Sequence, residues 1–341
     1  MSIVSNNSFY EDIVFLKGQQ QIVVDVETNG LIFDKNQICG IGVGEPFYGG
    51  KSQYYPFRHQ YLYGENLDPE YLPILIEYLN SIPEFIGHNI KFDIAFLEQE
   101  GLDVSSKSLI DTIVMARLTE HSEIRDMGLT ATGKRRYGEE AVGYDVEIKK
   151  FMRTNFQTNS DYSLAPSPLI GAYCKKDVEL TARLYQDTLE QIKKTEQEQV
   201  FALEKSLTKV LYDMESKGIT IDQKHAVWSK KLVLERLKVI ENQIYSMVGK
   251  EFKINSSKQL GELFTNMGIT SPVKTPGGAS SWNETALINI DNPVAGLIRQ
   301  YRTLVKLNST YIEPYTETNI MHTEYRNWGT TTGRLSSSKP N

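Results

Sequence analysis

The chain has 341 residues, of which 40% are hydrophobic and 23% are charged, which is enough for two or three domains with buried cores. The sequence contains no run of eighteen apolar residues and no N-terminal secretory pattern, so we expect neither a membrane span nor export. Cys39 and Cys174 are its only cysteines and form no CxxC pair. This argues against a disulfide framework or a thiolate zinc site and indicates a reducing, cytoplasmic environment.

The net charge of −6 is unevenly distributed along the chain. Residues 1–200 contain 19 Lys and Arg against 30 Asp and Glu, a balance of −11. Residues 201–341 contain 18 against 13, a balance of +5. This asymmetry fits an acid-rich metal site joined to a segment that binds a polyanion, with ordinary variation between domains as the alternative.

In chain order, the first predicted element is a strand with the sequence QIVVDVETNG, residues 21–30. The strands and helices expected after it are strands at 36–44 and 52–57, a helix at 68–80, a strand at 84–89, a helix at 91–101, and a helix or strand-to-helix step at 108–120. Strands followed by intermixed helices predict an α/β sandwich of about 190 residues.

The rest of the chain is predicted to be mostly helical. Residues 121–167 are polar and should form short helices joined by loops, and a long helical stretch, interrupted near 193–199, should run from 167 to about 218. Further helices are expected at 223–249, 255–268 and 292–315, with a loop at 275–282. In the last helix, Arg299, Arg302 and Lys306 are spaced to lie along one side.

The first strand contains two acids, Asp25 and Glu27, which point to the same face because side chains alternate along a strand. The apolar residues around them predict burial, where two adjacent carboxylates would repel each other strongly. Asp93 lies near the start of a predicted helix, and Tyr173 and Asp177 share one face of another. The sequence therefore offers four acids on elements that can converge.

Four clustered carboxylates favour hard divalent cations, Mg²⁺ or Mn²⁺. Two such ions roughly 4 Å apart can activate a water and stabilise the leaving oxygen of a phosphodiester. Each part also has a simpler interpretation: a solvent-facing acid pair on the strand, helix capping by Asn89 and Asp93, or a surface pair of Asp177 with Tyr173 in the core. The combination, in this order, is more specific than its parts.

These three segments resemble the three exonuclease motifs of the proofreading domain of family A DNA polymerases, the bacterial polymerase I type. The resemblance implies a ribonuclease H-like 3′–5′ exonuclease domain at 1–195, an α/β fold with a mixed sheet flanked by helices. It also implies two divalent metal ions. Asp25, Glu27 and Asp177 would hold the first ion, Asp25 would bridge to the second, and Asp93 would bind the second directly or through water. Tyr173 would orient the attacking water.

The same resemblance implies contacts with the last nucleotides of a single strand by Thr28, Leu31, Asn89 and Phe92. Phe92 stands where many relatives have tyrosine, so it retains a stacking surface without the hydroxyl. Asp111, in the sequence IDTIVMA, matches a family acid that we interpret as structural rather than catalytic.

The second half of the chain also resembles this family. Residues 196–315 are similar to the start of the polymerase domain and its helical thumb, and residues 316–341, which contain TGRLSSSKPN, are similar to the beginning of the palm. By this resemblance Lys306, Ser309 and Thr310 would contact phosphates of a primer–template duplex, and Arg334 would reach the minor groove near the primer terminus. A solvated helix face is the alternative for Lys306.

We therefore expect a metal-dependent 3′–5′ exonuclease of a DNA polymerase that releases nucleoside monophosphates, in the cytoplasm of a bacterium or a phage-infected cell. Its partners would be the single-stranded 3′ end, the primer–template duplex, and the remaining polymerase segment or replication accessory proteins, with no membrane. Because no later palm motif is present, we expect no primer extension, as for a truncated product or one piece of a split gene. The alternatives are an RNA-processing exonuclease of the same superfamily and a non-catalytic duplex-binding fragment.

Overall fold

The computed structural model describes residues 3–61, 66–121, 123–158, 160–338 and 340. The described residues form two compact units. The first unit comprises the chain up to Ser216 together with Tyr325–Ser337, and the second comprises Lys217–Glu324 and the C-terminal end. The sequence-based segments 1–195, 196–315 and 316–341 stay predictions.

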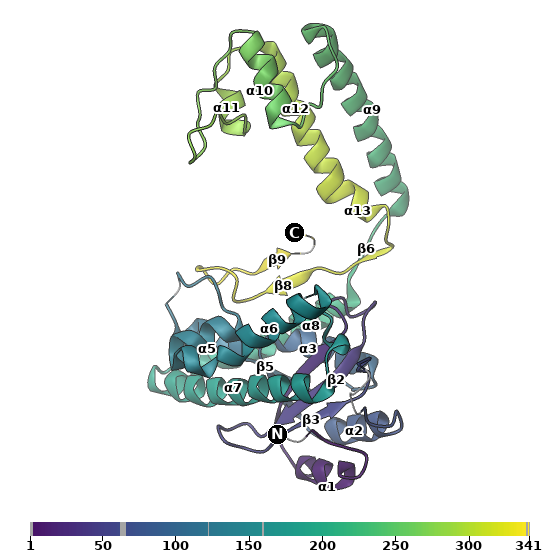
Figure 1. Ribbon diagram of the computed structural model, residues 1–341, viewed down its shortest axis with the longest axis vertical. Coiled ribbons are helices and arrows are strands. Elements are labelled where there is room, and N and C mark those ends of the chain that lie inside the picture. Colours follow the sequence, from purple (N-terminus) through teal and green to yellow (C-terminus); the bar gives the residue numbers. More distant parts are fainter. Residues whose placement is uncertain (1–2, 62–65, 122, 159, 339, 341) are drawn as a thin grey trace. The chain divides into compact units, whose positions relative to one another are not determined.

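The first unit is built on a mixed five-stranded sheet with the strand order β3-β2-β1-β4-β5 (Figure 1). The strands are β1 (Gln21–Thr28), β2 (Ile38–Gly44), β3 (Ser52–Pro56), β4 (Glu84–Gly87) and β5 (Ser108–Asp111). Strands β1, β2 and β3 are joined in antiparallel pairs, whereas β4 runs parallel to both β1 and β5. The predicted meander and mixed sheet are confirmed.

The central strand β1 separates two apolar clusters. Ile22, Val24 and Val26 lie in the larger cluster, together with residues of α2 (Tyr71–Asn80) and α3 (Ile90–Gln99). Val23 lies on the opposite face, in a cluster with Val178 of α7 (Ser167–Lys194). Figure 1 shows α7 lying across the sheet. Both faces of β1 are therefore covered, as its continuous apolar pattern predicts.

The other helices of the first unit largely follow the predicted pattern. They are α1 (Phe9–Ile13), η1 (Val14–Leu16), α4 (Thr112–Thr119), α5 (Leu129–Tyr137), η2 (Glu139–Ala141), α6 (Gly143–Phe156), η3 (Tyr162–Leu164) and α8 (Glu198–Lys217). The strand-to-helix step at 108–120 and the interruption between α7 and α8 are confirmed. The short helix α1 is not predicted, because five residues are too few to establish a helical period.

Three glycines of β2 leave room for close packing on one face of the sheet, two of them beneath α7 and one beside Tyr54 of β3. A Cβ on Gly42 would lie 2.4 Å from Sγ of Cys174, and one on Gly44 would lie 2.5 Å from a methyl group of Val178. A Cβ on Gly40 would overlap the ring of Tyr54. Because these glycines recur at every second position, all three face the same side, and α7 approaches the strand backbone there.

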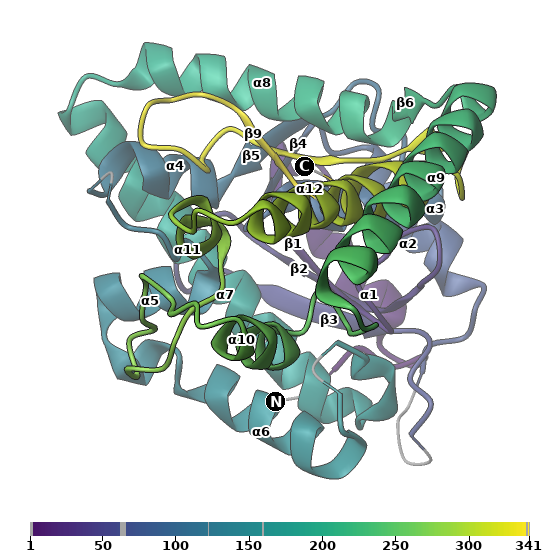
Figure 2. The same cartoon turned by 90° about the horizontal axis from the view of Figure 1, so that it is seen from above.

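The second unit is mostly helical, as predicted. Its elements are β6 (Ile219–Thr220), α9 (Gln223–Val248), α10 (Ser257–Asn266), α11 (Glu284–Ile288), α12 (Pro293–Leu307), the π-helical turn η4 (Asn308–Ile312), α13 (Glu313–Tyr315) and β7 (Ile320–Met321). Helices α9 and α12 lie side by side (Figure 1 and Figure 2) and bury Ile240, Ile244 and Ile298 in one cluster with α10 and α11.

Strand β6 pairs with β7, and strand β8 (Glu324–Arg326) pairs with β9 (Ser336–Ser338). None of the four was predicted, since each has only two or three residues. No helix among the described residues is long and apolar enough to cross a membrane.

Arg302 and Lys306 of α12 have different surroundings. The guanidinium of Arg302 donates to the carbonyl oxygen of Trp282 at 2.5 Å and to that of Ile254 at 3.3 Å. Arg302 therefore tethers two loops of its own unit, whereas Lys306 is exposed. Helical spacing places both residues on one side of α12 but does not show that the neighbouring loops bind Arg302.

Candidate active site

Strand β1 places Asp25 and Glu27 on the face that α7 covers. Their antiparallel neighbours on β2 are Gly42, opposite Asp25, and Gly40, opposite Glu27. Opposite residues in an antiparallel pair point to the same face, so both acids lie beside positions without a side chain. Glu27 is buried, with 4% of its surface exposed, and Asp25 is half-buried.

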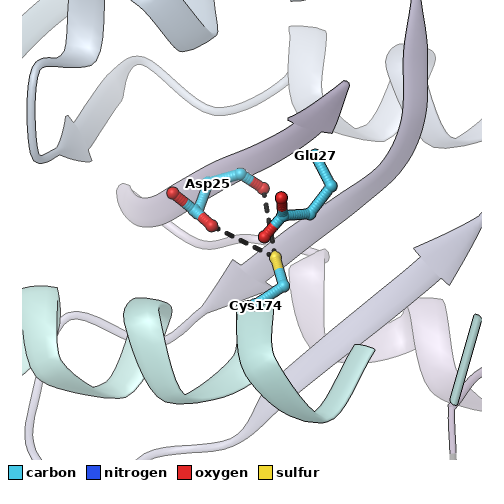
Figure 3. Close-up of side chains that lie close together, drawn as sticks. All are labelled: Asp25, Glu27 and Cys174. Carbon is cyan, nitrogen blue, oxygen red and sulfur yellow. Dashed lines mark hydrogen bonds between the residues drawn. The ribbon is translucent and has the colours of Figure 1, made fainter. Parts of the chain in front are cut away.

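Helix α7 brings the third motif to this pair of acids. Sγ of Cys174 lies 3.3 Å from Oδ2 of Asp25 and 3.5 Å from its backbone carbonyl oxygen (Figure 3). Asp177 follows three residues later, and residues three apart lie on one face of a helix. The charges of Asp177, Asp25 and Glu27 act on one another, so Asp177 lies near the strand-borne acids.

Asp93 reaches the same place from α3. Strand β4 ends at Gly87 and pairs with β1 only as far as Val23, which leaves the later amides of β1 without a strand partner on that side. Oδ1 of Asp93 accepts a 2.9 Å hydrogen bond from the amide of Val26. Asp93 thus takes the position of a missing ladder partner, on the residue between Asp25 and Glu27.

Burial, and for three of the four acids the charge of another acid in the cluster, raises the pKa values of the clustered carboxylates. Burial, followed by the charge of Asp93, raises the pKa of Asp25 to about 8. Burial likewise raises the pKa of Asp93 to about 8. Burial and then the charge of Asp25 raise the pKa values of Glu27 and Asp177 well above their usual range. A bound cation would oppose all four shifts.

A tyrosine hydroxyl forms a hydrogen bond with each of Asp177 and Asp145. The hydroxyl of Tyr144 on α6 donates to Oδ1 of Asp177 at 2.5 Å, and that of Tyr173 donates to Oδ1 of Asp145 at 3.3 Å. The Tyr173 ring stacks on Tyr162 with centroids 5.7 Å apart. Burial, followed by the charge of Asp177, raises the pKa values of Tyr144 and Tyr173, so both hydroxyls keep their protons.

Sequence reasoning missed Tyr144, Tyr162 and Cys174 as members of this site. Tyr144 and Tyr162 lie in the polar segment 121–167, where no motif spacing relates them to the acids. Cys174 lies between two motif residues, and the alternating glycines of β2 were the available signal that α7 would bring it against the strand.

The structure does not support the capping alternative for Asn89 and Asp93. Asn89 occupies the N-cap position of α3 in the left-handed region, at φ 70°, and its side chain makes no capping hydrogen bond. Its amide donates to Oδ1 of Asp111 at 3.0 Å, and the same oxygen accepts from the amide of Ile113. Asp111 therefore caps α4 and fixes the turn before α3, in line with its expected structural part.

Three further candidate residues differ in how accessible they are. Leu31 is 65% exposed, in the loop that follows β1. Phe92 is half-buried and its ring lies 4.9 Å from that of Phe96. Thr28 is buried, and its hydroxyl donates to the carbonyl of Gly30 at 2.6 Å. The Leu31 and Phe92 side chains are thus available to a ligand, whereas the Thr28 hydroxyl already has an acceptor.

The candidate duplex contacts lie away from this cluster in the sequence. Lys306, Ser309 and Thr310 are exposed near the end of α12 and in the turn η4. Arg334 is exposed in the loop between β8 and β9, where its carbonyl accepts from the hydroxyl of Thr330.

The donor set fits a divalent cation. One ligand atom from each of Asp25, Glu27 and Cys174 lies within 4.8 Å of the others. The charge of Asp25 acts on Asp177, and Asp93 binds the backbone between Asp25 and Glu27, so both acids lie near this group. Carboxylate oxygens are the ligands that Mg²⁺ and Mn²⁺ take in proteins. Asp25 and Glu27 of the predicted ligands thus lie in a group that could hold a metal ion, together with the thiol of Cys174.

Comparison with known proteins places this site in a family. Residues 1–194 match the 3′–5′ exonuclease family, and residues 224–341 match DNA polymerase family A. The chain belongs to the family A DNA polymerases. The match confirms the resemblance found in the sequence, with an exonuclease domain followed by the start of a polymerase domain.

Several curated relatives in this family are DNA polymerases I. The chain is 31% identical to that of Synechocystis sp. over 336 residues, covering 93% of this chain and 32% of that protein. It is 30% identical to that of Rhizobium leguminosarum over 268 residues, covering 75% and 25%. DNA polymerase DpoZ of Salmonella phage PMBT28 is 26% identical over 364 residues, covering 95% and 55%. The chain thus spans about a quarter to a third of these two bacterial polymerases.

A solved structure shares the fold. The POL domain of Pol1 from M. smegmatis, in a complex with DNA primer-template and dNTP, matches 99% of this chain and 55% of its own length with a TM-score of 0.64. Its sequence identity is 16%, so this likeness concerns the fold.

Proposed function

We propose that this chain carries a two-metal 3′–5′ exonuclease that shortens DNA from its 3′ end and releases nucleoside monophosphates. One observation carries the proposal. Acids from three separate elements, β1, α3 and α7, meet at one place, where the Asp93 carboxylate binds the backbone of β1 and the Cys174 thiol contacts Asp25. Burial of acids in this number without a cation raises their pKa values and weakens the fold.

Each residue would have one role, in holding a metal ion or in orienting the attacking water. Asp25, Glu27 and Asp177 would hold one divalent ion, Mg²⁺ or Mn²⁺, and Asp25 with Asp93 would hold a second. When bound, the ions supply a water of lowered pKa and neutralise charge on the phosphate. Tyr173, held protonated by burial, would orient the attacking water by donating its hydrogen bond to the water in place of Asp145.

The 3′ end of the DNA strand would lie against side chains near the C-terminal end of β1, which ends at Thr28. Leu31 is exposed there, and Phe92 offers a ring on which a base can stack. Asn89 and the backbone at Thr28 would hold the last nucleotides. Selectivity for mismatched ends then follows from their lower cost of unpairing and needs no base-specific contact.

The test is degradation of a 3′ single-stranded DNA in the presence of Mg²⁺. The chain should shorten the strand stepwise, and a chelator should abolish the activity. Asp25→Ala combined with Glu27→Ala should abolish it as well, because both metal positions lose a ligand. Unchanged degradation by this double variant would show that the site is assigned wrongly.

The same assay separates the alternatives. An equal or faster loss of RNA would favour an RNA-processing exonuclease. Binding of a primer–template without cleavage, at any Mg²⁺ or Mn²⁺ concentration, would favour a non-catalytic fragment. DNA is the preferred substrate in this proposal because residues 224–341 match the polymerase family.

We also propose contacts with a primer–template duplex, in the cytoplasm of a bacterial or phage-infected cell. Lys306, Ser309 and Thr310 would bind phosphates, and Arg334 would reach the minor groove. Phosphate contacts release counterions, so Lys306→Ala should weaken duplex binding equally for different sequences and lower the salt slope by about one. Lys194→Ala, at an exposed position paired with Glu190, is the control.

A further inference from the structure

A thiol is part of the carboxylate cluster. Sγ of Cys174 donates to Oδ2 of Asp25 at 3.3 Å, and it lies with the carboxylates of Asp25 and Glu27 in a group whose ligand atoms are within 4.8 Å of one another (Figure 3). Cys174 is fully buried. The thiol is therefore shielded from solvent in the metal-free fold and faces the acids.

The position of this thiol is set by packing. A Cβ on Gly42 would lie 2.4 Å from Sγ, so only a glycine at that position leaves room for the sulfur between α7 and β2. Gly42 is also the cross-strand neighbour of Asp25. The sulfur is thus held at a fixed place beside the first acid and cannot swing away without disturbing α7.

The second cysteine offers a contrast. Cys39 lies on β2 next to Gly40, so by strand alternation its side chain points to the face opposite the glycines. Its neighbours in that alternation, Ile41 and Val43, belong to the large apolar cluster. Cys39 is buried and free, yet it is not a member of the carboxylate group.

A site with a thiol and carboxylates prefers different metal ions from a site with carboxylates alone. Oxygen ligands favour Mg²⁺ and Mn²⁺, whereas a cysteine sulfur favours softer ions such as Zn²⁺, which binds Cys and Asp or Glu together. Magnesium gains little from a neighbouring sulfur, so the thiol would leave its binding nearly unchanged.

We propose that Cys174 is a ligand through which this site binds a thiophilic divalent cation, Zn²⁺ in the cell, in competition with Mg²⁺. The inference rests on the proposed function, because it takes Asp25 and Glu27 as the metal ligands of the exonuclease. The sulfur forms a bond to the ion together with these two carboxylates, and the thiol proton passes to solvent. The thiol thus sets which ions the site accepts.

The test uses Cd²⁺, whose bond to a thiolate gives a charge-transfer absorption in the ultraviolet. Titration of the full chain should produce this band with one equivalent of Cd²⁺. Cys174→Ala should abolish the band, whereas Cys39→Ala, the matched control, should keep it. Asp25→Asn combined with Glu27→Gln, which leaves both thiols in place, should weaken Cd²⁺ binding.

Affinity provides a second measurement that does not depend on catalysis. By calorimetry, Cys174→Ala should lower the affinity for Zn²⁺ by more than about tenfold, since loss of even an indirect partner of a metal costs 10- to 100-fold. Its affinity for Mn²⁺ should change less than about threefold. Cys174→Ser, of similar volume to cysteine, should behave as Cys174→Ala does. It provides a second test in case Cys174→Ala fails to fold.

The outcomes distinguish the two proposals. Absence of the band in the original chain, or its persistence in Cys174→Ala, overturns the role of the thiol, even if Mg²⁺-dependent degradation and its loss in the Asp25 and Glu27 variants are observed. A band that requires Cys174, Asp25 and Glu27 in a chain without nuclease activity would support the mixed site and reject the exonuclease assignment.

Discussion

The hydroxyl of Tyr144 donates a 2.5 Å hydrogen bond to Oδ1 of Asp177, which joins α6 to α7 at the acid cluster. The Tyr144 ring also lies 5.8 Å from that of Tyr173 and beneath the ammonium of Lys176. A carboxylate that binds a metal is commonly held in place by such a donor, which fixes its rotamer and its charge. Tyr144 therefore acts on the site through Asp177.

Tyr144→Phe removes the hydroxyl and keeps the ring. We expect the Mg²⁺ concentration at half-maximal exonuclease activity to rise by about tenfold, because outer partners of metal ligands contribute 10- to 100-fold to affinity. Mn²⁺ binding, measured by calorimetry or spin resonance, should weaken in parallel. The free energy of unfolding should fall by about 1 kcal/mol, the net contribution of one hydrogen bond.

Tyr137→Phe is the matched control. Tyr137 also donates to an aspartate, Asp187, at 2.8 Å, but at an exposed position outside the acid cluster. It should leave the Mg²⁺ requirement unchanged. Equal requirements in the Tyr144 and Tyr137 variants would show that the Asp177 contact has no part in metal binding.

Gly42 provides a test of the close packing of α7 on β2. A Cβ there would lie 2.4 Å from Sγ of Cys174 and 3.1 Å from a methyl group of Val178. Gly42→Ala should therefore lower the free energy of unfolding by about 1–3 kcal/mol, the usual cost of overpacking, and displace the third motif from Asp25. Urea unfolding and exonuclease rate are the two measurements.

A second substitution shows whether Cys174 is the group that clashes. In the double variant Gly42→Ala, Cys174→Ala, part of the lost stability should return, since the sulfur no longer occupies the space of the new methyl group. Gly277→Ala, at a position where a Cβ would meet nothing within 4 Å, is the neutral control. Additive costs in the double variant would contradict the proposed clash.

The sequence predicts the strand-borne part of this site well. Strand alternation fixes the shared face of Asp25 and Glu27, and helical spacing fixes that of Tyr173 and Asp177, because both follow from local backbone geometry. The mixed sheet follows in the same way from the order of strands and helices.

Long-range features could not be predicted in this way. The contact of Asp93 with the amide of Val26 depends on where β4 ends, and helix or strand ends are the least certain part of a sequence-based assignment. Tyr144 reaches Asp177 from a polar segment with no periodic pattern. The orientation of Arg302 depends on loops around Trp282, whose positions no local rule supplies.

The raised pKa values predict an unusual dependence of stability on pH in metal-free protein. Asp25 and Asp93 have pKa values of about 8 in the fold against an ordinary value of 3.8. Between about pH 4 and pH 8 the folded state therefore binds protons that the unfolded state has lost. The free energy of unfolding should accordingly decrease as pH rises from 5 to 8 in the presence of a chelator.

A divalent cation should remove this dependence, because it replaces the protons on the carboxylates. Mg²⁺ should thus stabilise the chain more at pH 8 than at pH 5. Asp93→Asn, which cannot ionise, should flatten the metal-free profile. The check is urea unfolding at both pH values with and without Mg²⁺. If the free energy of unfolding of Asp93→Asn depends on pH as steeply as that of the original chain, Asp93 is not a source of the pH dependence.

Two residues before Asp93, Lys91 connects the site helix α3 to the segment that contains β8. The Lys91 ammonium is buried, forms an ion pair with Glu215 of α8 and donates to the carbonyl of Tyr325. Glu215 in turn accepts from the amide of Tyr325 at 2.5 Å. All of these residues belong to the first unit, so the network ties its C-terminal segment to the helix that holds Asp93.

Lys91→Met should break this network while keeping the aliphatic part of the side chain. We expect a loss of about 2 kcal/mol in the free energy of unfolding, below the 3–5 kcal/mol typical of a fully buried pair because Glu215 is partly exposed. Amide exchange should accelerate at Tyr325 and its neighbours, since their anchor is gone. Lys194→Met, which breaks an exposed pair with Glu190, should cost less than about 0.5 kcal/mol. Unchanged exchange at Tyr325 in the Lys91 variant would mean that other contacts hold this segment on α3 and α8.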